Sequence, residues 1–232
     1  MVWKDLSEST SKIAQRVNAS LTVVPREHLE PEDVPSSGPP TEGTLYLFGG
    51  DDGKNPLRDM WVYDLPSGEW DEPEFMGEFP TGRSRHTCTL VRHYRDESQK
   101  AEDRLYVFGG VGQHTEVLVY LDLARSKWVA PRTIGKEPPA LLGHTAAQVG
   151  SALWLFGGRD TRRAYNTVWR MDTVSHEWVK PAPTGAQPPA CSKHCMVVRG
   201  TRLLITLGEI ALAQVAIYDT EKNAWLHAEV RA

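Results

Sequence analysis

The stretch that decides the fold is LYLFGG at Leu45–Gly50, which recurs as LYVFGG at Leu105–Gly110 and LWLFGG at Leu153–Gly158. A fourth copy, LLITLG at Leu203–Gly208, keeps the apolar residues but ends in one glycine instead of two. A short apolar run closed by glycine is typical of a β-strand that stops at a turn. Copies spaced by about 50 residues indicate a repeat architecture.

Further residues recur in phase with these runs. Each run is followed by an aromatic or apolar residue and, after six intervening positions, a tryptophan: Tyr63 and Trp70, Leu121 and Trp128, Met171 and Trp178, Tyr218 and Trp225. An aspartate follows the first member of each pair: Asp64, Asp122, Asp172 and Asp219. Sixteen residues after each of the first three tryptophans comes a histidine: His86, His144 and His194. Agreement of order and spacing makes coincidence a poor explanation.

Each repeat predicts four short antiparallel strands, which we name a to d in chain order. Strand a begins at the histidine, strand b is the apolar run, strand c ends near the aspartate, and strand d carries the tryptophan. Linkers such as GEFPTGRS and GKEPPALLG contain proline and glycine, which interrupt helices. Four-stranded sheets repeated with this period are expected in a β-propeller.

The pattern resembles the Kelch-repeat family over roughly residues 44–228. The resemblance implies an all-β fold, a β-propeller of Kelch type with about four four-stranded antiparallel blades, complete or partial. Leu121, Met171 and the single glycine of the fourth copy depart from the family pattern. The structural motif comprises the glycines after strand b and the tryptophans expected between blades: Gly49, Gly50, Trp70, Gly109, Gly110, Trp128, Gly157, Gly158, Trp178, Gly208 and Trp225.

The predicted propeller covers residues 18–232, with blades at approximately 18–72, 85–129, 143–179 and 193–227. Residues 1–17 are a leader or, through Trp3, the remnant of a preceding blade. Two polar insertions between strands a and b, Pro25–Gly43 and His93–Asp103, are expected to emerge on one face. The repeats leave open whether the chain is a fragment, closes as a small propeller or self-associates.

Composition narrows the function classes. The net charge of −4 and pI near 6.1 give no electrostatic attraction to nucleic acid or to an anionic membrane. No apolar run reaches the roughly 18 residues that a membrane span needs. Three cysteines are too few for a disulfide framework and favour a reducing compartment. We therefore expect a cytoplasmic protein with neither nucleic-acid nor membrane partners.

The search for chemistry predicts no catalytic residue, no metal site and no cofactor, and hence no enzyme. Cys191-x-x-His194-Cys195 lacks a complete metal-ligand set, and strand alternation would send His194 and Cys195 to opposite faces. Neither a nucleophile elbow nor a phosphate-binding loop occurs. Aspartates that recur in every repeat are expected to be architectural.

The remaining candidate is the face formed by the d–a and b–c loops, whose residues differ between repeats. Arginine suits carboxylates, so we expect a protein partner with an acidic segment; a mixed, solvated rim is the competing interpretation. The resemblance also implies that the protein is an interaction scaffold whose partners dock on this face. The alternatives are a metal-dependent propeller enzyme and the substrate-recognition subunit of a ubiquitin ligase. The expected contact residues are Asp51, Asp52, Arg83, Arg85, Arg159, Arg162, Arg163 and Lys193.

Overall fold

The computed structural model describes residues 13–25, 43–95, 100–112, 117–207 and 215–226. These residues are all-β and form four sheets, which we call blades one to four. Blade one contains β1 (Ser20–Val24), β2 (Thr44–Phe48), β3 (Met60–Asp64) and β4 (Glu69–Asp71). Blade two contains β5 (Thr87–Arg95), β6 (Lys100–Phe108), β7 (Leu118–Asp122) and β8 (Lys127–Val129).

Blades three and four follow the same order. Blade three contains β10 (Thr145–Val149), β11 (Ala152–Phe156), β12 (Val168–Asp172) and β13 (Glu177–Val179), with β9 (Ile134–Gly135) added at its outer edge. Blade four contains β14 (Cys195–Arg199), β15 (Arg202–Thr206), β16 (Val215–Asp219) and β17 (Ala224–Leu226). Strands a to d of each blade pair antiparallel with their sequence neighbours, as the repeat predicts.

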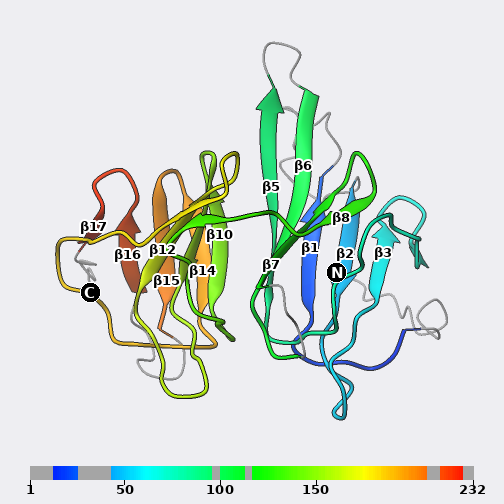
Figure 1. Ribbon diagram of the computed structural model, residues 1–232, viewed down its shortest axis with the longest axis horizontal. Helices are drawn as coiled ribbons and strands as arrows, with labels where there is room; N and C mark the ends of the chain where they lie inside the picture. The colour runs from blue at the N-terminus through cyan, green and yellow to red at the C-terminus, as the bar shows by residue number, and fades with distance from the viewer. Residues whose placement is uncertain (1–12, 26–42, 96–99, 113–116, 208–214, 227–232) are drawn as a thin grey trace, which may run out of the picture.

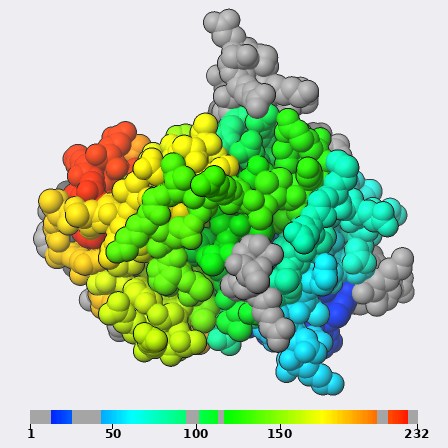
Figure 2. Space-filling model, in the orientation of Figure 1, coloured from blue at the N-terminus to red at the C-terminus, as the bar shows by residue number. Residues whose placement is uncertain are grey.

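The blades follow one another around an axis in chain order. Their first strands are neighbours, β1 beside β5, β5 beside β10 and β10 beside β14. Blades one and four lie at opposite sides of the molecule in Figure 1. Figure 2 shows the same succession on the surface, from blue and cyan through green to yellow and red. The described residues therefore form four consecutive blades of a β-propeller.

The hydrophobic core lies between successive blades. Trp128, Trp178 and Trp225 are each at most 4% exposed, and each packs within 5.5 Å of a phenylalanine at the end of strand b in the preceding blade. Trp70 has no described blade before it and is only half-buried. The tryptophans thus fill the space between blades, as expected from their size.

Each d–a linker crosses to the next blade and pairs in parallel with its strand d. Ile134 and Gly135 pair with β13, Met76 pairs with Lys127, and Thr184 pairs with Ala224. A glycine seven residues after the tryptophan in each of these three linkers, Gly77, Gly135 or Gly185, lets the backbones approach. A Cβ on Gly135 would lie 2.4 Å from the carbonyl oxygen of Trp178. The linkers therefore fasten each blade to its successor at the outer edge.

Near the axis, a histidine bridge fastens the blades. The Nε2 atom of His86 lies 2.8 Å from Ser20 Oγ, that of His144 lies 2.9 Å from Thr87 Oγ1, and that of His194 lies 2.8 Å from Thr145 Oγ1. Each pair joins the residue before strand a of one blade to the first residue of strand a in the preceding blade. These histidines are structural hydrogen-bonding groups.

The second polar insertion does not form a loop over its whole length. Its ends continue strands β5 and β6, which pair as far as Arg95 and Lys100. Figure 1 shows this hairpin extending beyond the other strands. Most of the first insertion, Trp3 and Gly208 lie outside the described residues. Leu207, which stands where the other copies have their first glycine, is buried and has no positive φ.

Candidate interaction face

One end of the propeller gathers the d–a and b–c loops around the axis. Four residues have a left-handed backbone, with φ between 56° and 62°. Arg85, Gly143 and Lys193 each directly precede a bridging histidine, and Asn18 precedes Ala19 at the equivalent place in blade one. Their backbones form a chain of hydrogen bonds. The Arg85 N–H donates to the Asn18 carbonyl at 3.0 Å, Gly143 to Arg85 at 3.0 Å, and Lys193 to Gly143 at 2.8 Å. These hydrogen bonds fix the positions of the four residues around the axis at this end of the propeller, which we call the mouth.

Cationic side chains lie at this mouth. Arg85 and Lys193 are exposed members of the backbone chain, and Arg159 is also exposed. Arg159 joins them because its N–H donates to the Leu142 carbonyl at 3.0 Å and Leu142 donates back at 2.9 Å. Leu142 directly precedes Gly143, which bonds to both Arg85 and Lys193. The tertiary structure thus brings together three cations from blades two, three and four.

The b–c loop of blade three holds two more exposed arginines. Asp160 Oδ1 accepts the backbone N–H groups of Arg162 and Arg163 at 2.7 and 2.8 Å. Its Oδ2 accepts the Tyr165 hydroxyl hydrogen at 2.6 Å. The bond from Tyr165 and then the two backbone bonds lower the pKa of Asp160 to about 2. Arg163 stacks on the Tyr165 ring at 4.9 Å, so the loop has a defined shape.

The two aspartates predicted for blade one stabilise their own loop. Asp52 Oδ1 accepts the backbone N–H groups of Lys54 and Asn55 at 2.9 and 2.8 Å, and these bonds lower the pKa of Asp52. Asp51 accepts the Gly53 N–H at 3.2 Å and the Asn18 side-chain amide at 3.3 Å. These carboxylates shape the loop, as Asp160 does in blade three.

Arg83 does not lie on the exposed face. Its side chain is completely buried, and it donates to the carbonyl groups of Gly109 and Thr81 at 3.5 and 3.4 Å. Leu141 and Cys191 occupy the same position, three residues before the bridging histidine, in the later linkers, and both are buried. Sequence position alone could not distinguish this buried arginine from the exposed Arg85 two residues later.

A hollow of about 570 Å³ opens on this face between blades one and two. The Arg58 guanidinium lies at its edge, 5.6 Å from the Phe79 ring centre. Among the described residues no carboxylate lies within ion-pair distance of Arg58. The hollow adds a concave, cationic surface beside the mouth. Its remaining walls are Asn55, Pro56, Thr81, Gly82, Val111 and Gly112.

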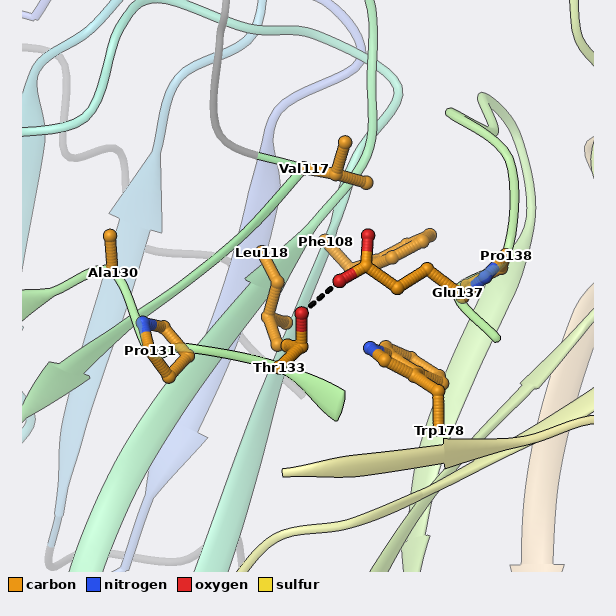
Figure 3. Close-up of a pocket in the computed structure, with 9 residues that line it drawn as sticks. All are labelled: Phe108, Val117, Leu118, Ala130, Pro131, Thr133, Glu137, Pro138 and Trp178. Carbon is orange, nitrogen blue, oxygen red and sulfur yellow. Dashed lines mark hydrogen bonds between the residues drawn. The ribbon is translucent and has the colours of Figure 1, made fainter. Parts of the chain in front are cut away.

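A second hollow of about 170 Å³ lies between blades two and three, under the linker that follows β8 (Figure 3). Three of its walls are the apolar side chains of Phe108, Leu118 and Trp178. Beside them the Thr133 hydroxyl donates a hydrogen bond to the Glu137 carboxylate. The other walls are Val117, Ala130, Pro131 and Pro138.

The described part of the chain contains no group of three or more metal-ligating side chains. Cys191 is buried, which raises the pKa of its thiol to about 11, whereas Cys195 is exposed. His194 lies between them and bonds to Thr145. The described residues also include no helix of the length and apolarity that a bilayer crossing requires.

The four sheets, their shared inter-blade bridges and their variable loop face define a repeat propeller whose loops are suited to recognition. Residues 41–232 match the family model described as the KLHDC2/KLHL20/DRC7 Kelch-repeats domain. The chain belongs to the Kelch-repeat family. The predicted family and the predicted all-β propeller fold are thereby confirmed.

Individual relatives carry the same repeats. Kelch repeat-containing protein 2 of Saccharomyces cerevisiae is 32% identical over 143 residues, which is 56% of this chain and 16% of the relative. Host cell factor 2 of Homo sapiens is 28% identical over 158 residues, 56% of this chain and 19% of the relative. Rab9 effector protein with kelch motifs of Xenopus laevis is 30% identical over 121 residues, 50% and 31%. The matched regions span less than a third of each of these relatives.

Proposed function

We propose that this Kelch domain is an intracellular scaffold that binds a protein partner through the d–a and b–c loop face, and that the partner contributes an acidic segment. The observation that carries the proposal is the convergence of Arg85, Arg159 and Lys193 through backbone hydrogen bonds at the propeller mouth. Asp52 and Asp160 lie on the same face, but their carboxylates are engaged by loop N–H groups. The face therefore presents cations to a partner.

The family supports an interaction role. One relative is named as an effector of Rab9, and others are named as a Kelch repeat-containing protein, host cell factors, acyl-CoA-binding domain-containing proteins and a Rho GTPase-activating protein. The name of the Rab9 effector states a protein partner for that relative. For this chain, the cationic mouth supplies the chemical reason to expect acidic groups on the partner.

The test compares protein capture by three forms of the chain. Arg85→Glu/Arg159→Glu reverses charge at the mouth, and Arg199→Glu/Lys222→Glu reverses two exposed charges in the turns at the opposite end as a control. Pull-down with quantitative mass spectrometry should lose partners with acidic segments in the first variant only. Added salt should weaken the same interactions. Equal capture by both variants would exclude the mouth as the binding surface.

We also propose a cytoplasmic location. All three cysteines are free thiols, which suits a reducing compartment. A fluorescent fusion expressed in cells should be distributed in the cytoplasm. Accumulation in the secretory pathway would contradict the proposal. Neither metal-dependent catalysis nor a ubiquitin-ligase subunit is favoured by a specific observation in the described residues, so we do not propose them.

Self-association is a second proposal for the isolated domain, and the end blades support it. Leu21 and Val23 are 59% and 46% exposed on β1, and Val197 and Val215 are 62% and 39% exposed on blade four. Inner blades cover the corresponding surfaces against their neighbours. Light scattering after size-exclusion chromatography should show dimers that dissociate on replacing Leu21 and Val197 with Glu. A monomer at all concentrations would disprove self-association.

A further inference from the structure

The hollow in Figure 3 exists because one linker differs from its counterpart in the same chain. In the linker between blades one and two, Phe75 and Phe79 lie five and nine residues after Trp70. Their rings pack on Trp128 at 6.4 and 5.5 Å, and Phe79 also lies 6.3 Å from Phe48. Two phenyl rings thus fill this inter-blade space.

In the linker between blades two and three, the same two positions hold Thr133 and Glu137. The phenylalanine and tryptophan that form the floor of this space are the same at both junctions. Phe108 lies 5.5 Å from Trp178, just as Phe48 lies 5.5 Å from Trp128. Removing two rings from an otherwise equivalent site leaves the cavity of about 170 Å³. An apolar cavity of about 150 Å³ is large enough for a benzene ring.

We propose that this hollow, which we call the aromatic pocket, receives one aromatic side chain of the partner, and that tyrosine fits it best. The equivalent junction shows that rings pack well on this floor. Glu137 is exposed and accepts the Thr133 hydroxyl hydrogen, and a carboxylate has capacity for further donors. A phenol can place its ring on Phe108 and Trp178 and donate its hydroxyl hydrogen to Glu137.

The inference deepens the proposed function, on which it rests for its biological role. The pocket is built by Val117, next to the b–c loop of blade two, and by the d–a linker residues Thr133 and Glu137. The residue after Thr133, Ile134, pairs with Glu177 of β13, so the pocket lies at the outer edge between blades two and three. An aromatic anchor seated in a pocket and surrounded by charged contacts is the common arrangement of an interface hot spot.

The first experiment uses N-acetyl-tyrosine amide as the probe and follows the indole N–H signal of Trp178 by NMR. We expect a saturable shift with a dissociation constant on the order of 1 mM, as for a small ligand. N-acetyl-phenylalanine amide should bind more weakly and N-acetyl-leucine amide more weakly still. No saturable shift at Trp178 with the tyrosine probe would overturn the proposal.

The second experiment fills the pocket from within. Thr133→Phe/Glu137→Phe recreates the pattern of the first linker, so it should raise the thermal midpoint of unfolding by roughly 2–4 °C. It should also raise the dissociation constant of the probe by about tenfold or more. Gln187→Phe, at the equivalent place in the next linker, is the control and should keep probe binding. Undiminished probe binding in a folded double-phenylalanine variant would also refute the pocket.

Failure of this inference is distinguishable from failure of the proposed function. If the mouth variant Arg85→Glu/Arg159→Glu loses partner capture and Trp178 does not respond to the probe, the scaffold function stands without the pocket. If Trp178 responds and the mouth variant keeps its partners, the pocket stands and the cationic mouth does not.

Discussion

Thr145 Oγ1 lies 2.8 Å from Nε2 of His194, and this contact joins the first strand of blade three to the start of blade four. The same bridge joins Ser20 to His86 and Thr87 to His144. A hydroxyl at the start of one strand a therefore meets the histidine of the next blade at each of the three junctions. Because strand a lies closest to the axis, the bridges connect the blades where their backbones are closest.

The bridge should contribute measurably to stability. Thr145→Val keeps the side-chain shape but leaves His194 Nε2 buried without its hydroxyl partner, and an unsatisfied buried group costs about 1–3 kcal/mol. Urea denaturation should show a loss of that size. Thr161→Val changes an exposed threonine in a loop and serves as the control. Equal midpoints for the two variants would argue against a stabilising bridge.

Stability should fall as the pH is lowered. Burial, with His86 and His194 nearby, lowers the pKa of His144 from 6.5 to about 3, and burial lowers the pKa of His194 to about 4. Below pH 6.5 the unfolded chain binds protons that the folded chain excludes, so this contribution is complete above pH 6.5 and declines toward pH 3–4.

Between pH 6.5 and 5 the loss should be roughly 2 kcal/mol per histidine. Denaturant unfolding across this range measures it. His144→Gln removes one titrating group and should flatten the slope while lowering stability at neutral pH. A slope that is unchanged in His144→Gln would show that other groups cause the pH dependence.

The pairing of the d–a linker with strand d of the next blade predicts that substitution of two glycines has different effects. A Cβ at Gly135 would lie 2.4 Å from the Trp178 carbonyl oxygen, and φ is 82°. Gly135→Ala should therefore cost about 3 kcal/mol. Gly150 has φ of 59° but open space around it, so Gly150→Ala should cost only about 1 kcal/mol. Similar thermal midpoints for both variants would contradict a stabilising role for the close packing of the linker against β13.

The Asp160 carboxylate should control the order of its loop. Asp160→Ala removes the acceptor of the Arg162 and Arg163 N–H groups, so their amide hydrogen exchange should accelerate. Asp52→Ala is a reciprocal control, because it should accelerate exchange at Lys54 and Asn55 instead. The prediction fails if exchange at Arg162 does not respond to loss of Asp160. Asp160→Ala should also weaken capture of the acidic partner, because the loop loses its order.

By itself, the sequence determined the repeat, the four strands of each blade and the place of the tryptophans, because alternation, glycine turns and spacing act over short stretches of chain. It also identified the bridging histidines, although not their partners. Side-chain exposure was not accessible in this way. Arg83 and Arg85 are two residues apart, yet one is completely buried and the other is exposed.

Only the tertiary structure decided how loops from different blades meet. Arg85 and Lys193 are far apart in sequence, and they approach because both bond to the backbone of Gly143. The aromatic pocket depends on comparison of two junctions in space, where Thr133 and Glu137 replace Phe75 and Phe79 above equivalent floors. Local patterns fix each blade, whereas contacts between blades fix the surface, since those contacts join residues that no short-range periodicity relates.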